Sequence, residues 1–242
     1  MKYNTRFNPT ISGPLHIGHL YMALVNAAEA HRTGGKFIIR VDDTQAVWNH
    51  WIKKEQREKY YEDYQEQLGL FVDVNVWERQ SQMLTPEEII GDNPILKCPP
   101  PPSWGANINI EWRANIDQRV FQYHFYSVVE KVIWDYWQKV NLLIRGDDLI
   151  TEAQLYEHIT TILGFGIVRQ IYLPKLMSIN LRDDIRAEVS KTNKLYTLET
   201  QIDAFGIDET MNLLKEACLI DPDGEFFVDN IKSNPVARGF KA

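Results

Sequence analysis

The 242-residue sequence contains only two cysteines, Cys98 and Cys218, and they lie far apart. A disulfide framework or a cysteine zinc site needs several cysteines at close spacing, so we expect neither. No apolar run is long enough to span a membrane, and no segment reads as a signal peptide. We therefore expect a cytoplasmic protein without a membrane partner.

Positive charge is also scarce, because 26 Lys and Arg stand against 33 Asp and Glu, which gives a net charge of -7. Non-specific DNA binding needs a basic surface, so we expect no DNA partner. RNA bound in a local basic groove stays possible. Internal repeats are absent, and we expect a monomer. The 44% hydrophobic content supplies the core of one large α/β domain.

The first third of the chain predicts the order strand, helix, strand, helix. Apolar residues recur at helical spacing between Gly18 and His31, and "KFIIRV" is a β-branched run typical of a buried strand. The four predicted elements cover residues 3–8, 18–31, 36–41 and 53–68. This order predicts a parallel sheet with ligand chemistry at the carboxyl ends of its strands.

A proline-rich stretch over residues 86–106, which includes "CPPPPSWG", separates this part from a second α/β half. The second half reads as an aromatic-striped helix, a strand "NLLIRG", a helix over 151–163, a strand "VRQIYLP" and a helical end from Thr197. We divide the chain into a first catalytic half, a reduced connecting insertion, a second half, and a loop with a helical stem-contact-like region. These segments cover residues 1–74, 75–112, 113–186 and 187–242.

The stretch "SGPLHIGHL" places two histidines around a glycine at a strand-to-helix corner. The first turn of a helix offers free backbone N–H groups and a partial positive charge, which attract phosphate. Gly18 permits close approach of a ligand, while His16 and His19 lie one turn apart and can both bond phosphate oxygens. The alternative is a pair of surface histidines near a helix cap.

The segment "TRFNPTISGPLHIGHLYMALVNAAEAHRTGGKFIIRVDDT" resembles the opening of the class I glutamyl- and glutaminyl-tRNA synthetases, with "HIGH" as its central motif. The resemblance implies a Rossmann-like α/β catalytic domain, a parallel sheet flanked by helices. It also implies a ligase that uses ATP and Mg²⁺ to form an aminoacyl-adenylate. The ATP-binding residues that it implies are His16, Gly18, His19 and Asp148.

The second nucleotide motif of that family, KMSKS, is similar to "RAEVSKTNK" in this sequence. The resemblance assigns Ser190 and Lys191 to ATP, and Lys191, with His16 and His19, to catalysis at the leaving pyrophosphate. Glu188 replaces the family's first lysine. By itself the tetrapeptide "VSKT" also fits a polar loop.

The resemblance further implies a set of residues that hold the amino acid: Arg6, Thr10, Asp42, Tyr123, Ser127 and Arg145. Arg6 would grip a carboxylate with its guanidinium fork, and Asp42 would hold the α-ammonium group. Tyr123 matches a family tyrosine, although its aromatic neighbours also fit a plain core position. Ser127 stands where the family has asparagine.

Arg145 carries the expected choice between glutamate and glutamine. Its segment "LLIRGDDLI" resembles "VIRGEDHI" of bacterial glutamyl enzymes and "VVRGADLL" of the glutamyl-queuosine tRNA(Asp) synthetase, in which the arginine contacts the side-chain carboxylate. A buried arginine that faces a neutral amide is poorly paired, so we expect glutamate over glutamine. In contrast, "LHIGH" and "RVDDT" look closer to glutaminyl and archaeal-type enzymes. The alternative is an Arg145 paired with Asp147 or Asp148.

Compared with full-length members of the family, the sequence is truncated. The insertion is short and without the bacterial zinc-binding cysteines, and no anticodon-binding region follows Lys191. The predicted function is activation of glutamate, or less favourably glutamine, followed by transfer to a tRNA or tRNA-like acceptor. Two alternatives stay open: transfer to a non-tRNA acceptor, or a catalytically impaired paralogue that acts as a nucleotide- or RNA-binding regulatory module.

Overall fold

The computed structural model describes residues 1–43, 53–96, 118–180, 185–188, 196–231, 235–237 and 240. For residues 118–126, 178–180, 185–188 and 237 it describes the backbone only. Tyr123, Ser190 and Lys191 therefore lie outside the residues whose side chains are described.

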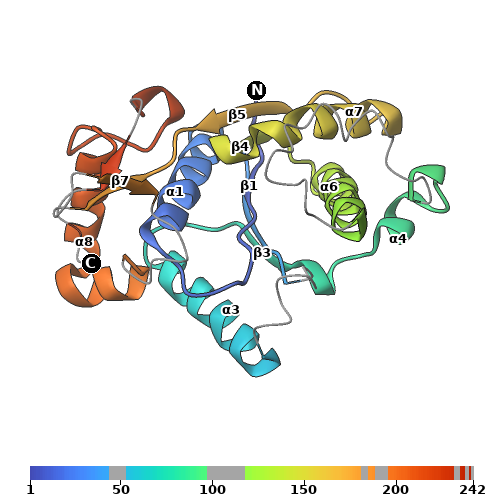
Figure 1. Ribbon diagram of the computed structural model, residues 1–242. Helices are drawn as coiled ribbons and strands as arrows, with labels where there is room; N and C mark the ends of the chain where they lie inside the picture. The colour runs from blue at the N-terminus through green and yellow to red at the C-terminus, as the bar shows by residue number, and fades with distance from the viewer. Residues whose placement is uncertain are drawn as a thin grey trace.

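A five-stranded sheet forms the centre of the molecule (Figure 1), and all its strand pairs are parallel. Its strands are β1 (Thr5–Phe7), β2 (Phe37–Val41), β3 (Val76–Arg79), β4 (Leu142–Gly146) and β5 (Arg169–Leu173). They lie in the order β3-β2-β1-β4-β5, which is the doubly wound order. The direction of winding reverses between β1 and β4, and ligands of such sheets bind at the carboxyl ends of those two strands.

Helices cover both faces of this sheet (Figure 1). The helices are α1 (Ile17–Arg32), α3 (Lys54–Gly69), α4 (Pro86–Ile90), α6 (Gln118–Trp137), α7 (Ala153–Leu163) and α8 (Leu198–Ala217). Short 3-10 turns are η1 (Gln80–Gln82), η2 (Pro94–Leu96), η3 (Asp147–Glu152) and η4 (Val228–Asn230). The predicted Rossmann-like α/β class is confirmed.

Strand β2 is apolar at four of its five positions, the exception being the buried Arg40, and its packing shows why. Phe37 and Ile39 pack into the cluster around α1, whereas Ile38 between them packs against α6 and α7. Successive side chains of a strand point to opposite faces, so a strand covered on both sides favours apolar residues at consecutive positions. The same alternation holds in β4.

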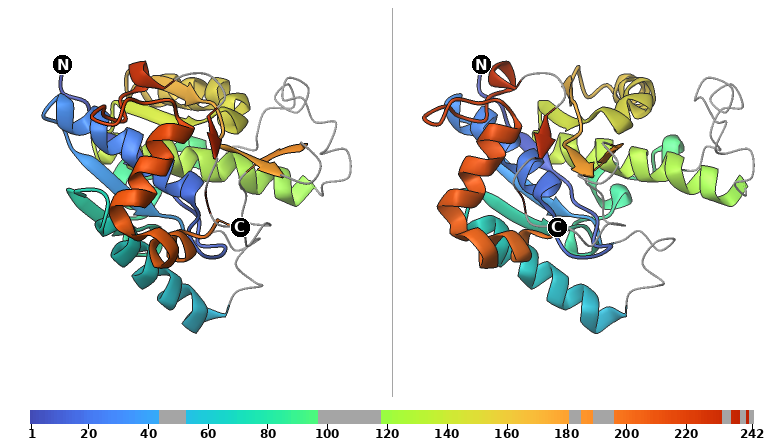
Figure 2. Two further views of the ribbon diagram at one scale, coloured as in Figure 1. Left: turned by 90° about the vertical axis from the view of Figure 1, so that its left-hand side faces the viewer. Right: turned by 60° about the vertical axis from the view of Figure 1, so that its left-hand side comes forward.

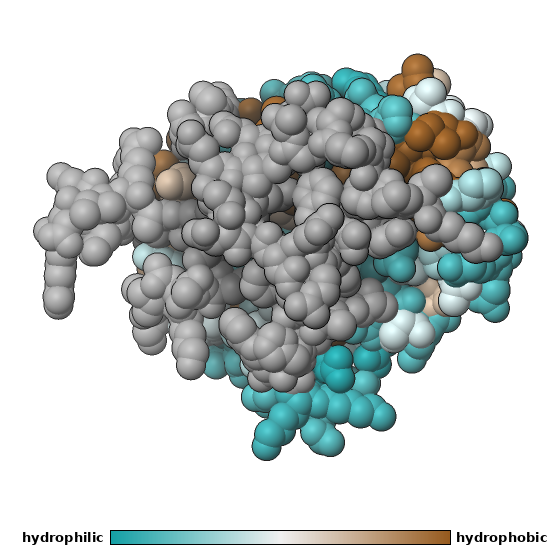
Figure 3. All heavy atoms as spheres, turned by 45° about the vertical axis from the view of Figure 1, so that its right-hand side comes forward, coloured by the Kyte–Doolittle hydropathy of each residue, from teal (hydrophilic) through white to brown (hydrophobic). Residues whose placement is uncertain are grey.

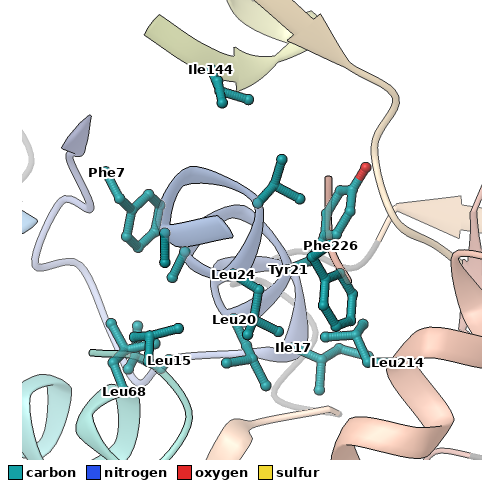
Figure 4. Packing of buried hydrophobic residues seen from close by; sticks show 14 of the residues in the cluster. Phe7, Leu15, Ile17, Leu20, Tyr21, Leu24, Leu68, Ile144, Leu214 and Phe226 are labelled. Carbon is teal, nitrogen blue, oxygen red and sulfur yellow. The ribbon is translucent and has the colours of Figure 1, made fainter. Parts of the chain in front are cut away.

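Helix α1 brings the largest share of the core on its face of the sheet (Figure 4). Its Leu20 and Tyr21 are 0% and 1% exposed, and they pack with Leu214 of α8 and Phe226. Burying one such side chain contributes about 1.5–3 kcal/mol. This packing holds the start of α1, and with it the two histidines, against the sheet.

The C-terminal part contains a small second sheet that the sequence did not predict. Its strands β6 (Met177–Asn180), β7 (Ile185–Glu188) and β8 (Val236–Ala237) lie in the order β7-β6-β8. Helix α8, which was predicted as part of a helical end, kinks at Gly206, whose φ of 75° favours glycine. Figure 2 shows α8 on the same side of the central sheet as α1.

On the face drawn in Figure 3, the described residues are mostly hydrophilic, with an apolar patch at the upper right. Within the described ranges, no helix is long and apolar enough to cross a membrane.

Candidate functional site

The two histidines lie at the first turn of α1, directly after the loop that leaves β1. His16 is the N-cap residue, and its imidazole ring stacks on that of His19 with 3.8 Å between ring centroids. The backbone N–H of His16 donates to Nδ1 of His19 at 3.2 Å. Because Nδ1 accepts this bond, a neutral His19 carries its proton on Nε2, which can then donate to a ligand oxygen. The sequence-predicted corner is thus confirmed as a strand–loop–helix junction.

The loop is held in place by bonds to the end of β2. The N–H of Ile11 donates to the carbonyl of Asp42 at 3.0 Å, and that of Asp42 donates to the carbonyl of Pro9 at 2.8 Å. Thr10 and Asp42 therefore lie side by side at the carboxyl ends of neighbouring strands. Asp42 is 1% exposed. The next residue, Asp43, pairs with Arg79 at 3.0 Å.

A pocket of about 300 Å³ opens at the carboxyl ends of β1 and β4, where the sheet order reverses. It brings together seven predicted site residues from three parts of the chain: Arg6, Thr10, His16, Gly18, His19, Arg145 and Asp148. Its lining also includes Phe7, Asn8, Tyr21, Met22, Leu176 and Lys175. Lys175 was not among the predicted residues, although the same strand-end rule points to it, because it follows directly after β5 and Pro174.

Two other predicted residues are described but do not line this pocket. Asp42 is buried beside Thr10, and Ser127 is half-buried on α6. Their roles toward an amino acid stay predictions.

Arg6 is bonded inside the protein. Its Nε and Nη2 donate to the two carboxylate oxygens of Asp135, at 2.9 and 3.2 Å. Arg40 Nη1 lies 2.9 Å from Asp135 Oδ1, and the Tyr156 hydroxyl donates to Oδ2 at 2.8 Å. The guanidinium fork that was expected to grip a substrate carboxylate is therefore bonded to Asp135, and any bond from Arg6 to a substrate stays a prediction.

This network is buried, since the exposed fractions are 5% for Arg6 and 0% for Arg40 and Asp135. Burial by itself raises the pKa of Asp135. The positive charges of Arg6 and Arg40 have a larger, opposite effect, so the pKa is lowered to about 2. A carboxylate inside an otherwise apolar helix segment, "VIWDYW", is the sequence signal that could have revealed Asp135.

Arg145 has an internal acidic partner as well. Its Nη1 lies 3.5 Å from Oε2 of Glu152, and both side chains are less than a tenth exposed. Its Nη2 donates to the side-chain oxygen of Gln170 and, at 3.4 Å, to the hydroxyl of Tyr172. The guanidinium also lies over the ring of Tyr156, 5.2 Å from its centroid. The alternative prediction, that Arg145 pairs with a carboxylate of the chain, is confirmed, but the partner is Glu152 rather than Asp147 or Asp148.

The segment after the KMSKS-like sequence pairs with the HIGH segment. The N–H of Ile17 donates to the carbonyl of Tyr196 at 3.2 Å, and the N–H of Leu198 donates to that of Leu15 at 2.9 Å. Lys191 is only five residues before Tyr196. The described residues that follow the KMSKS-like sequence therefore lie beside the HIGH segment, while Ser190 and Lys191 themselves lie outside the described residues.

Comparison with known proteins agrees with this geometry. Residues 2–86 match the family described as tRNA synthetases class I (E and Q), catalytic domain. The matched residues make up about a third of the chain, and over them the chain is similar to this catalytic domain. Among curated proteins, this part of the chain is similar to the Glutamyl-Q tRNA(Asp) synthetase of Methylococcus capsulatus, with 51% identity over 41 residues. That match covers 17% of this chain and 14% of the relative.

A second curated relative is the Glutamate--tRNA ligase 1 of Novosphingobium aromaticivorans, 41% identical over 80 residues, which are 32% of this chain and 16% of the relative. The matched part thus spans about a sixth of each relative. Among solved structures, a glutamate tRNA ligase from Elizabethkingia meningosepticum superimposes with a TM-score of 0.61 and 14% identity. This superposition covers 98% of this chain and 67% of the solved chain, and at that identity it shows the fold alone.

Proposed function

We propose that this chain activates glutamate or glutamine with ATP as an aminoacyl-adenylate and passes it to a tRNA or tRNA-like acceptor. The observation that carries the proposal is the single pocket that joins the HIGH histidines to Arg6 and Arg145. A nucleotide's phosphates and an amino acid's carboxylate can meet there. The curated relatives, which include a glutamate--tRNA ligase and a glutamyl-Q tRNA(Asp) synthetase, support the amino-acid class.

The charge of the buried groups also supports a carboxylate ligand. The three guanidinium groups of Arg6, Arg40 and Arg145 face two carboxylates, those of Asp135 and Glu152. One positive charge is left without a counter-charge inside this network. A buried charge without a counter-charge is costly, so the α-carboxylate of a bound amino acid would stabilise the network.

In the proposed reaction, the α-carboxylate attacks the α-phosphorus of ATP and the bond to pyrophosphate breaks. The N-terminal turn of α1 and the Nε2–H of His19 stabilise the growing negative charge on the phosphate oxygens. Catalysis comes from alignment and charge stabilisation rather than from a general base. Ser190 and Lys191 are predicted to bond the leaving pyrophosphate.

Within the described residues, no group of three or more His, Cys, Asp or Glu could hold a metal ion. Mg²⁺ would enter with the phosphates of ATP as part of the substrate, and neutralise their charge.

The test is exchange of labelled pyrophosphate into ATP in the presence of glutamate or glutamine, with and without total tRNA. We expect exchange that depends on the amino acid. His19→Ala should lower it by about a hundredfold, as loss of one donor to a developing charge does. The control is His31→Ala, an exposed histidine at the far end of the same helix. Absence of exchange under all these conditions would contradict the proposal.

A second candidate function follows from the internal partners of both arginines. Asp135 and Glu152 already hold these groups, as a protein without amino-acid chemistry would require. A regulatory module would bind nucleotide or RNA but no aminoacyl-adenylate analogue. Calorimetry with ATP, with total tRNA and with a non-hydrolysable adenylate analogue separates the two functions.

A further inference from the structure

Glu152 lies at the end of η3, directly before α7, and its carboxylate lies behind the pocket wall that Arg145 forms. It is 6% exposed, and its Oε2 is 3.5 Å from Arg145 Nη1. Its charge also acts on Arg6: burial lowers the pKa of Arg6, while Asp135, Tyr156 and Glu152 raise it. One carboxylate thus affects both guanidinium groups of the pocket.

This carboxylate changes what Arg145 selects. A bare buried guanidinium requires a negative ligand, which is why an arginine here predicts glutamate. In this chain the charge of Arg145 is already balanced by Glu152, and its other bonds go to the neutral oxygens of Gln170 and Tyr172. A side-chain carboxylate placed against Arg145 would bring a second negative charge to a guanidinium that Glu152 already pairs from behind, and like charges near each other in a buried site repel.

The net charge of the buried network beside the pocket supports the same preference for a neutral side chain. The network of Arg6, Arg40, Arg145, Asp135 and Glu152 has one positive charge in excess, which the α-carboxylate of an amino acid balances. Asp42, which is buried beside Thr10 and is not part of the pocket lining, is the predicted counter-charge of the α-ammonium group. Glutamine brings only these two charges, whereas glutamate adds one more negative charge.

We propose that Glu152 is a specificity-determining residue, which neutralises Arg145 and shifts the side-chain preference of the pocket from a carboxylate toward a neutral amide. The inference rests on the proposed amino-acid activation. Glutamine is then activated at least as well as glutamate, and the choice between the two depends on the Arg145–Glu152 pair rather than on Arg145 by itself.

The experiment measures kcat/KM in pyrophosphate exchange for glutamate and for glutamine, with total tRNA present. Glu152→Gln keeps the size of the side chain and removes its charge, so the ratio of glutamate to glutamine should rise about tenfold or more. Glu66→Gln makes the same chemical change on the exposed side of α3 and should leave the ratio unchanged. A folding defect would lower both values together and would not move their ratio.

Because Glu152→Gln leaves Arg145 buried without its counter-charge, a double variant provides a second test. Arg145→Gln with Glu152→Gln removes both charges, and the ratio should stay within a few-fold of that of the unchanged protein. If Arg145 selects glutamate by itself, the double variant loses a strong glutamate preference, and the inference is wrong. A ratio that Glu152→Gln does not move also overturns it.

Binding separates this inference from the proposed activity. Dissociation constants for non-hydrolysable glutamyl- and glutaminyl-adenylate analogues, measured by calorimetry, give the same ratio without turnover. A ratio that shifts in Glu152→Gln while exchange is absent contradicts the activity and supports the role of Glu152. Binding of neither analogue contradicts both.

Discussion

Replacement of Asp135 by asparagine is the sharpest test of the buried network beside the pocket. Asp135 accepts bonds from Arg6 and Tyr156 and pairs with Arg40, with distances of 2.8–3.2 Å. Asparagine has nearly the same shape but no charge. The variant therefore leaves two guanidinium groups buried without their counter-charge, and breaking a buried pair in this way costs about 3–5 kcal/mol.

The lowered pKa of Asp135 gives a second value for how much its charge contributes to the free energy of unfolding. It is lowered from an ordinary value of 3.8 to about 2, mainly by the charges of Arg6 and Arg40 against the opposing effect of burial. A depressed carboxyl pKa stabilises the folded state above pH 4, and this contribution is lost as the pH falls toward 2. The shift corresponds to about 2 kcal/mol, because one pKa unit is about 1.4 kcal/mol.

Urea unfolding at pH 7, and at intervals down to pH 2, measures both effects. We expect Asp135→Asn to lower the free energy of unfolding at pH 7 by several kcal/mol and to flatten its decline below pH 4. The control is Asp229→Asn, since Asp229 is 79% exposed and only 3.6 Å from Arg32. Such a surface pair contributes about 0–1 kcal/mol. If both variants lower the free energy of unfolding by the same small amount, the buried network does not stabilise the fold in this way.

Three further predictions concern buried groups elsewhere, each measured as the free energy of unfolding in urea. Tyr21→Phe removes a buried hydroxyl that has no hydrogen-bond partner among the described residues, and it should not destabilise the protein. Tyr64→Phe removes a bond of 2.7 Å to a loop carbonyl and should cost about 1 kcal/mol. Equal losses would contradict this. Burial and a neighbouring carboxylate raise the pKa of Glu130 to about 7, so stability should fall as the pH rises from about 4.5 to 7, and Glu130→Gln should remove that fall. If Glu130→Gln leaves the dependence of stability on pH unchanged, the pKa of Glu130 is not raised. Gly35→Ala places a Cβ 1.8 Å from a backbone oxygen and should cost several kcal/mol, while Gly69→Ala meets open space and should be neutral or stabilising.

Local pattern was sufficient for the elements that build the sheet. Strand β2 and helix α1 follow from apolar periodicity, because that periodicity reflects which faces of an element are buried. The HIGH corner was likewise readable, since a strand, a glycine-containing loop and a helix start are all local features. The neighbouring strand β3 lies within residues 75–112, which were expected to be a connecting insertion, and its half-buried residues carry no strong pattern.

Tertiary structure decided which charges meet. Asp135 lies 129 residues from Arg6, and no spacing rule predicts that helix α6 brings its carboxylate to the first strand. Glu152 is only seven residues from Arg145, yet Asp147 and Asp148 are nearer in sequence, and only the path of η3 selects the partner. Sequence therefore determined that cationic groups gather at the ends of β1 and β4. How strongly each cation is neutralised, and hence what the pocket selects, depends on contacts that form only when distant elements pack together.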